Sequence, residues 1–353
     1  MRRRHNARSR VVGRKTVSGI VRPAAAVLTL LFLFFLARGF HTSAGAATGE
    51  RYELRGRVLQ IDGKPFRNGL LPVIFLHGST TPFLAETVAD PSGRFKFKDL
   101  LAGMYTVAVV VPQGGQLQQT VDIGPGSADA RRRVEQSFTL DFPDAPPDWH
   151  TVSAVALSIP EKARREYGKA RQRLRARDAA GATLFLRKAV EIAPRYVDAW
   201  NNLGTIAYQS RDYRQAEVYF REALKHDPDA YAPLVNLGGA LLSQGRAPDS
   251  LPVNKQAFAA RPGDALANSQ LGQSYYLLGQ PDSAEPYLKQ AKALDPRHFS
   301  FPQLVLAEIY RQRRDYAAWA AELEEFLRYH PDSSVAPAAR EALQQARLLE
   351  RLP

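Results

Sequence analysis

The side chains that most often catalyse reactions or bind metals are sparse in this 353-residue sequence. It contains no cysteine, which excludes disulfides, thiolate metal sites and cysteine nucleophiles. The seven histidines are scattered, and none stands in an H-x-x-E or H-E-x-x-H zinc motif. Three of them, His226, His298 and His330, recur near proline turns, where a partly cationic ring would stabilise a helix C-terminus. We therefore expect no metal site, and predict that these three histidines cap helices.

Two kinds of short stretch could be mistaken for reactive loops. His77-Gly78-Ser79 lacks the surrounding G-x-S-x-G elbow of a hydrolase, and no acid–base partner can be assigned to it. Gly114-Gly115 and Gly124-Pro125-Gly126 carry no lysine and precede no helix, unlike a phosphate-binding loop. Turns at strand ends account for all of them. The prediction is a protein that is not an enzyme, with no catalytic residues and no cofactor.

The net charge of +13 is concentrated at the amino terminus. Residues 1–46 contain nine Lys or Arg and no Asp or Glu, which leaves 39 basic against 35 acidic residues downstream. A nucleic-acid-binding domain would carry a basic stripe on its folded surface, beside aromatic residues or a recognised reading motif. The charge distribution therefore argues against a nucleic-acid partner.

The basic stretch belongs instead to an export signal. Residues 24–37 (AAAVLTLLFLFFLA) form an uncharged run between Arg22 and Arg38. Its length suits a signal-peptide hydrophobic region, for which about 7–15 residues suffice, better than a membrane span of about 20. Ala44-Gly45-Ala46 would suit a signal peptidase, whereas the long basic region favours an uncut anchor. Residues 1–46 are thus a signal peptide or signal anchor, and the folded domains are expected outside the cytoplasm, in the periplasm or cell envelope.

Residues 50–142 predict a β-sandwich. Short segments rich in β-branched and aromatic residues alternate with turn residues at roughly 8–12-residue spacing. Within Arg94–Lys98 the charged and aromatic residues alternate strictly, so that both phenylalanines face a core. The seven expected strands are Glu53–Ile61, Leu71–His77, Leu84–Ala89, Arg94–Lys98, Tyr105–Val111, Leu117–Ile123 and Val134–Phe142.

The motifs of this region resemble those of the carboxypeptidase regulatory-like domain, a transthyretin-like sandwich. The resemblance rests on Gly56-Arg57-Val58, Asp62-Gly63-Lys64-Pro65, the run from Asp90 to Phe97, and Leu100 to Gly103 followed by Tyr105. These match the running pattern G-x-V, D-G-x-P, D-x-x-G-x-F-x-F and L-x-x-G-x-Y. The resemblance implies a non-enzymatic accessory module of about 90 residues.

A helical repeat array is expected over residues 161–332, after a proline-rich linker at 143–160. Ser158-Ile159-Pro160-Glu161 predicts a helix start with a serine N-cap. Pro194, Pro228, Pro262 and Pro296 are 34 residues apart. Small residues recur with the same period at three further offsets: Ala170, Gly204, Gly238 and Gly272; Ala182, Ala216, Ser250 and Ala284; and Ala189, Ala223, Ala257 and Ala291.

This period and these offsets resemble the tetratricopeptide repeat, a helical hairpin in which small residues allow close helix approach. About five repeats are expected, at 163–196, 197–230, 231–264, 265–298 and 300–332. Repeat one has Glu166 and Lys169 where Trp and Leu are usual, and is interpreted as the amino-terminal cap. Asn254 replaces the usual aromatic residue of repeat three. Residues 333–353 are expected to form a capping helix with a polar outer face. The fold class is therefore α+β and multidomain.

In the tetratricopeptide family, the first helices of successive hairpins line a concave groove that binds partners. The resemblance places in this groove Arg171, Arg175, Asp198, Asn201, Thr205, Tyr208, Gln209, Val235, Leu242, Ser269, Gln273 and Tyr276. Tyrosines are favoured in interfaces because they offer a large contact area at a small entropic cost. Asn202 and Asn236 belong to the ordinary repeat pattern and need not touch a ligand. No lysine occupies the positions used by peptide-carboxylate clamps, so that ligand is not predicted.

The leading functional hypothesis is an exported or anchored scaffold that binds other proteins or peptides in this groove. Its membrane contact would be confined to the amino-terminal segment, and its oligomeric state is left open. The alternative is a cell-envelope glycan- or polymer-binding protein that acts through the sandwich. That alternative requires an exposed aromatic row, for which Phe66, Phe75 and Phe83 are the candidates.

Overall fold

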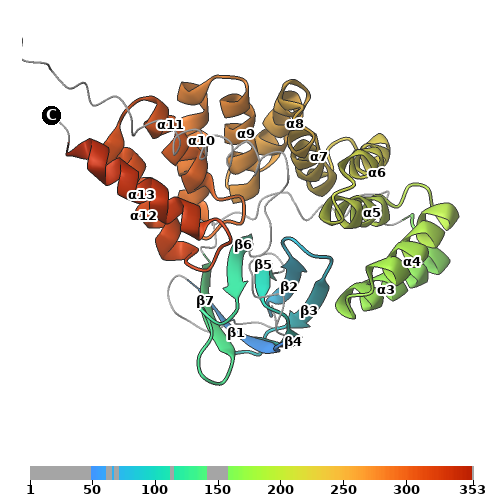
Figure 1. Ribbon diagram of the computed structural model, residues 1–353. Helices are drawn as coiled ribbons and strands as arrows, with labels where there is room; N and C mark the ends of the chain where they lie inside the picture. The colour runs from blue at the N-terminus through green and yellow to red at the C-terminus, as the bar shows by residue number, and fades with distance from the viewer. Residues whose placement is uncertain (1–48, 61–65, 67–70, 112–114, 141–157, 352–353) are drawn as a thin grey trace, which may run out of the picture.

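The computed structural model describes residues 49–60, 66, 71–111, 115–140 and 158–351. The expected hydrophobic signal at 24–37 and linker residues 143–157 lie outside these ranges. Within them, seven strands are followed by eleven helices. Figure 1 shows the helices as an arc, with the strands grouped beneath it on its inner side. The predicted order of a β-sandwich followed by paired helices is confirmed.

The strands form two sheets. A three-stranded sheet has the order β4-β1-β7 and a four-stranded sheet the order β3-β2-β5-β6. β1 runs parallel to β7, whereas the other pairs are antiparallel. The strands are β1 (Tyr52–Gln60), β2 (Val73–Gly78), β3 (Leu84–Val88), β4 (Arg94–Leu100), β5 (Gly103–Val111), β6 (Gly115–Ile123) and β7 (Arg133–Leu140).

Alternation along each strand builds the sandwich core. Phe95 and Phe97 are both 7% exposed, as the alternation predicts. Phe95 packs against Phe138 of β7 with ring centroids 5.8 Å apart. A Cβ at Gly56 would lie 2.0 Å from that Phe95 ring, so β1 needs glycine where it passes over the ring. The outward side of the four-stranded sheet is left to contact other parts of the chain.

The helices form five antiparallel hairpins and one closing helix. Aspartates cap the N-termini of three second helices and one first helix: Asp178, Asp212, Asp264 and Asp315 each accept a hydrogen bond from a first-turn backbone N–H. The hairpins are α3 (Glu161–Arg175) with α4 (Ala179–Ile192), α5 (Val197–Gln209) with α6 (Tyr213–His226), α7 (Tyr231–Ser243) with α8 (Ala247–Ala260), α9 (Ala265–Leu277) with α10 (Pro281–Leu294), and α11 (Pro302–Gln312) with α12 (Tyr316–Tyr329). The closing helix is α13 (Ala336–Glu350).

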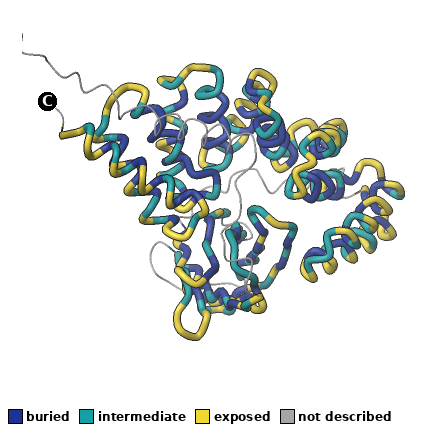
Figure 2. Tube along the Cα trace, in the orientation of Figure 1, coloured by how far each residue is buried: buried dark blue, intermediate teal, exposed yellow. Residues whose placement is uncertain are grey.

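Small residues let the two helices of each hairpin approach. An added Cβ at Gly204 would lie 2.3 Å from the ring of Phe220, and one at Gly272 would lie 2.7 Å from Leu288. The recurring alanines are buried as well, with Ala223 and Ala257 fully enclosed. Buried positions therefore follow the seams between helices, as Figure 2 shows.

Two local expectations need correction or completion. The prediction of a serine N-cap for α3 is wrong, because the N-cap residue is Pro160 and no side chain caps the helix. In the third hairpin, Asn254 is completely buried and takes the place of an aromatic residue over Gly238. Its amide donates to Ser274 Oγ at 2.9 Å, and Ser274 also lies 2.9 Å from Ser250 Oγ. A small polar network thus replaces apolar packing at this seam.

We predict that Gly204→Ala lowers the stability of the array by about 1–3 kcal/mol, because the new methyl group would overlap the Phe220 ring. The matched control is Gly168→Ala in α3, where nothing lies within 4 Å of the new Cβ. Helix propensity alone should make that variant neutral or more stable by up to about 1 kcal/mol. Urea unfolding followed by circular dichroism measures both, and equal stabilities of the two variants would contradict the close-approach explanation.

Candidate functional site

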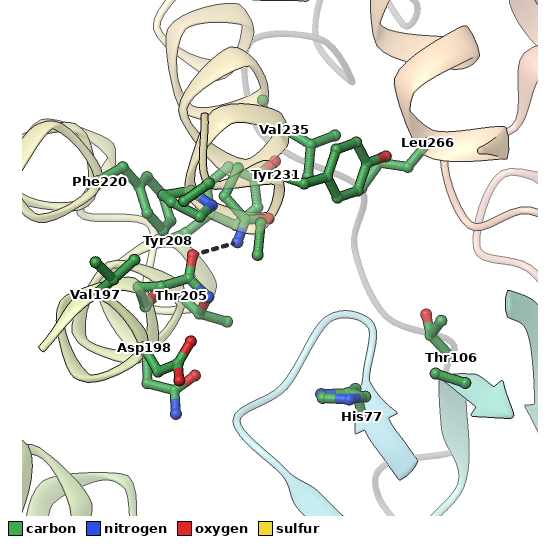
Figure 3. A pocket seen from close by; sticks show the side chains of 18 of the residues that line it. His77, Thr106, Val197, Asp198, Thr205, Tyr208, Phe220, Tyr231, Val235 and Leu266 are labelled. Carbon is green, nitrogen blue, oxygen red and sulfur yellow. Dashed lines mark hydrogen bonds between the residues drawn. The ribbon is translucent and has the colours of Figure 1, made fainter. Parts of the chain in front are cut away.

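A chamber of about 600 Å³ lies between the helical array and the four-stranded sheet. One wall is the concave face formed by α5, α7 and α9. The other is the outward face of β2, β5 and β6 together with the residue that follows β2, and it contributes His77, Ser79, Thr106, Ala108 and Gln118. Figure 3 shows His77 and Thr106 on the strands, across the chamber from Asp198 and Thr205. The groove predicted from the repeats is therefore covered by the protein's own sandwich.

Contacts with the first two hairpins hold one end of the sandwich. Arg177 donates a hydrogen bond to the Tyr105 hydroxyl at 2.8 Å, and its guanidinium lies 4.5 Å from the ring centroid of Phe83. Arg171 forms an ion pair with Glu86 of β3. Gln209 Nε2 donates to the backbone oxygen at position 78 at 2.8 Å. These contacts use two residues, Arg171 and Gln209, that the sequence assigns to partner binding.

A buried hydrogen bond holds the opposite end. The backbone N–H of Thr120, on the free edge of β6, donates to Asp295 Oδ2 at 2.8 Å. Asp295 is 4% exposed, and this burial raises the pKa of its carboxyl group against the opposing effect of the Thr120 hydrogen bonds. An aspartate from the turn after α10 thus covers an edge strand and fixes the sandwich to the fourth repeat.

Six of the twelve predicted groove residues line the chamber: Asp198, Asn201, Thr205, Tyr208, Gln209 and Val235. The other six lie outside its lining. Leu242, Ser269 and Gln273 are 6%, 0% and 6% exposed and pack within the array. Tyr276 accepts a hydrogen bond from Gln312 at 2.9 Å, and Arg175 is an exposed residue at the end of α3. Arg171 is engaged by the sandwich, as described above.

The repeat pattern did not identify the sheet residues of the chamber. Period-two alternation indicates that His77, Thr106 and Gln118 point away from the sandwich core. It does not indicate what they face, because that depends on how the two parts dock. Asn202, Asn236, Tyr231 and Gln270 also line the chamber.

The asparagines form a structural ladder, in agreement with their ordinary place in the repeat. Asn202 Nδ2 donates to the Tyr167 hydroxyl at 2.9 Å, and Asn236 Nδ2 donates to Asn201 Oδ1 at 2.9 Å. Each bond links the first helix of one hairpin to the first helix of the preceding hairpin. The ladder therefore sets the spacing of adjacent repeats on the groove side.

Burial controls the charge of the groups in the chamber. The pKa of Asp198 is raised, first by burial and then by the nearby Asp227 carboxylate. The pKa of His77 is lowered to about 4, chiefly because nearby protein atoms displace part of the water around the ring and secondarily because of the Arg171 charge. Its side chain still reaches water inside the chamber. At neutral pH His77 is consequently an uncharged hydrogen-bonding group.

The expectation that His298 and His330 act as partly cationic helix caps is wrong. Both are buried, at 4% and 3% exposure. Burial lowers the pKa of His298 to about 3 and that of His330 to about 4, so both rings are neutral at physiological pH. His298 Nδ1 lies 2.6 Å from Ser300 Oγ, and the His330 ring packs against Phe301 and Phe326.

The aromatic residues named for glycan binding do not form an exposed row. Phe66 and Phe83 are 8% and 9% exposed and belong to the sandwich core, while Phe75 is partly exposed on the outward face. Among the described residues, no group of three or more His, Asp or Glu side chains is placed to hold a metal ion. Within the same ranges, none of the helices combines the length and hydropathy needed to span a bilayer.

Comparison with known proteins agrees with this architecture. The tetratricopeptide repeat family matches residues 197–230 and residues 265–298. The chain is a tetratricopeptide repeat protein with an N-terminal β-rich region, and proteins of this class bind proteins and peptides. The domain family of the β-rich region is not established by these matches.

Individual relatives share only parts of this chain. The cell division cycle protein 16 homologs of Homo sapiens and Mus musculus are 27% identical over 122 residues, which is 32% of this chain. The chain matches only 20% of the length of those proteins. Among solved structures, YrrB, described as a TPR protein with an unusual peptide-binding site, is 21% identical, with a TM-score of 0.43 over 54% of this chain and 98% of its own. MamA from Desulfovibrio magneticus RS-1 is 21% identical, with a TM-score of 0.42 over 55% and 98%.

We predict that acid destabilises the carboxyl-terminal repeats before the carboxylates titrate. The folded-state pKa values of His298 and His330 lie below their unfolded values, so the unfolded chain binds more protons as the pH falls below about 6.5. Each buried histidine should make the free energy of unfolding about 2 kcal/mol smaller at pH 5 than at pH 7.5. Urea unfolding at these two pH values measures the loss. A His298→Gln/His330→Phe double variant should lose much of this dependence, and an unchanged dependence would refute the assignment.

Proposed function

We propose that this chain is a protein-interaction scaffold that holds a short segment of a partner protein in the chamber between its repeats and its sandwich. The observation that carries the proposal is the shared lining: groove residues of three successive hairpins face outward-pointing residues of the sheet across about 600 Å³. Pockets of about 300–1,000 Å³ bury most of the surface of a ligand of a few hundred daltons, which is the size of a short peptide segment.

The chemistry of the lining supports a peptide partner. Tyr208, Tyr231 and Val235 provide apolar and aromatic area, while Thr106, Thr205 and Gln118 provide uncharged hydrogen-bonding groups. Interfaces combine these same features, with rigid aromatic contact area and a few oriented polar groups. The buried positions of Phe66 and Phe83 weigh against the alternative of a glycan platform on the sandwich.

The proposal includes a place of action outside the cytoplasm. It is supported by the basic residues before the apolar run at 24–37 and by the small residues at Ala44-Gly45-Ala46. The absence of cysteine is compatible with an oxidising compartment. The repeats and the sandwich would then face the periplasm or cell envelope, either released or tethered.

We predict that filling the chamber from the sheet side abolishes partner binding. Ala108→Trp introduces a large side chain at a lining position of β5, whereas the matched control Val88→Trp changes a 56% exposed position of β3 outside the lining. A photo-crosslinking amino acid replaces Thr205 in the full-length chain, which is produced in its native cells. Irradiation then links this residue covalently to any protein that lies in the chamber. Mass spectrometry should recover a cross-linked partner peptide from the wild-type and Val88→Trp backgrounds and not from Ala108→Trp. Equal cross-linking in all three would overturn the proposed binding site.

Amino-terminal sequencing of the mature chain, combined with cell fractionation, tests the location. Export with cleavage predicts a new terminus after Ala46, whereas an uncut anchor predicts an intact terminus in the membrane fraction. An intact chain in the cytosolic fraction would contradict both forms of the proposal.

A further inference from the structure

The ladder of side-chain amides on the groove side follows one rule. Asn202 bonds to Tyr167, and Asn236 bonds to Asn201, so each amide donates to the residue 35 positions earlier in the chain. The acceptor lies on the first helix of the preceding hairpin, one residue before the repeat position that corresponds to the donor. In both steps, the side chain at the earlier position carries an oxygen that can accept.

The next step of the ladder is broken. The rule places Val235 opposite Gln270, and a valine side chain can neither donate nor accept. Gln270 is 8% exposed, and its Oε1 is buried without a hydrogen-bond partner anywhere in the described structure. Leaving a buried amide oxygen unpaired is unfavourable, because water no longer satisfies it.

The unpaired amide lies at the wall of the chamber. Gln270, Val235 and Gly239 all belong to its lining. A Cβ at Gly239 would lie 2.7 Å from Gln270 Nε2 and 3.9 Å from the Tyr208 hydroxyl. The missing side chain of Gly239 therefore leaves room for the amide group of Gln270 above the α7 backbone.

The charge of the lining favours a ligand without a large net charge. Its arginines are Arg164, Arg195 and Arg261, and its aspartates are Asp198, Asp227 and Asp264, so the two signs balance. His77 adds no charge at neutral pH because its pKa is lowered to about 4. Around Gln270 the neighbours Val235, Gly239 and Tyr208 are uncharged. An unpaired carboxylate or ammonium group would lose its hydration there without a counterion.

We infer that Gln270 recognises the side-chain carboxamide of an Asn or Gln in the partner segment. A primary amide presents an N–H and a C=O on one edge, so two such groups can pair through two hydrogen bonds. A trans peptide group points its N–H and C=O in opposite directions and can satisfy only one atom of Gln270. The inference rests on the proposed function, since it assumes that a peptide enters the chamber.

Two substitutions test this pairing without relying on loss of the fold. Val235→Asn supplies the missing acceptor within the ladder. The new side chain should form a hydrogen bond with the Gln270 amide within the protein. Gln270→Met removes both hydrogen-bonding atoms at similar volume. Val235→Ala is the matched control, because it alters the same position but leaves Gln270 unpaired.

The probes are pools of pentapeptides that carry a fluorescein label, an acetylated amino terminus and a carboxyl-terminal amide. Each pool has one fixed central residue: Asn, Gln, Ser, Ala or Glu. Fluorescence polarisation with the purified full-length chain should show the tightest binding for the Asn or Gln pool. Val235→Asn and Gln270→Met should each lower the affinity for that pool about tenfold relative to the affinity of the same variant for the Ala pool, the effect of losing a paired hydrogen-bonding group. Val235→Ala should retain the preference.

The outcomes separate this inference from the proposed function. Binding of all pools with no dependence on the central residue or on Gln270 would overturn the inference while leaving a peptide-binding chamber. Failure of every pool to bind the wild-type chain would overturn both. A neutral oligosaccharide mixture serves as a competitor, and its binding in place of the peptides would likewise overturn both.

Discussion

Close approach of paired helices is the constraint on which the rest of the structure depends. Glycine or alanine at the crossing lets a side chain of the second helix lie directly on the backbone of the first, as Phe220 does over Gly204. A hairpin packed in this way still has an unburied apolar edge, so it needs a neighbour on each side. Stacking the hairpins then generates a curved array whose first helices share one face, and α13 closes its far end with a polar outer surface.

The curved face is not left open. The sandwich lies on its inner side (Figure 1) and is held at one end by Arg177 and Gln209 and at the other by Asp295. These contacts are hydrogen bonds, one cation–π contact and the ion pair between Arg171 and Glu86, and Leu84 and Met104 of the sheet also pack against apolar clusters of the array. Such an arrangement fixes the distance between sheet and array while leaving a chamber between them. A partner segment would consequently meet two walls from different parts of the chain, which restricts its length and its shape.

Polar groups inside the array have two different consequences. Where every amide has a partner, as in the bond from Asn236 to Asn201, the groups set the spacing of the repeats. At the seam of the third hairpin, Asn254 is satisfied only in part, because its Nδ2 donates to Ser274 Oγ while its Oδ1 is buried without a partner. Where the partner is missing, as at Gln270, the same chemistry leaves an unsatisfied atom beside the chamber. The difference arises from a single residue, Val235, on the preceding hairpin.

The period of 34 residues and the strict alternation of the strands predict both parts of the fold from local patterns, because helix and strand periodicity depend only on near neighbours in the chain. Of the positions that the family resemblance assigns to partner binding, Asp198, Thr205 and Tyr208 line the chamber. The same pattern could not show that the sandwich engages Arg171, that Ser269 and Gln273 are buried, or that His298 and His330 are neutral. Those properties depend on contacts between residues far apart in the sequence. The sequence by itself determined the elements and their order, whereas only the tertiary structure decided which faces meet, because docking and burial are set by the packing of whole surfaces.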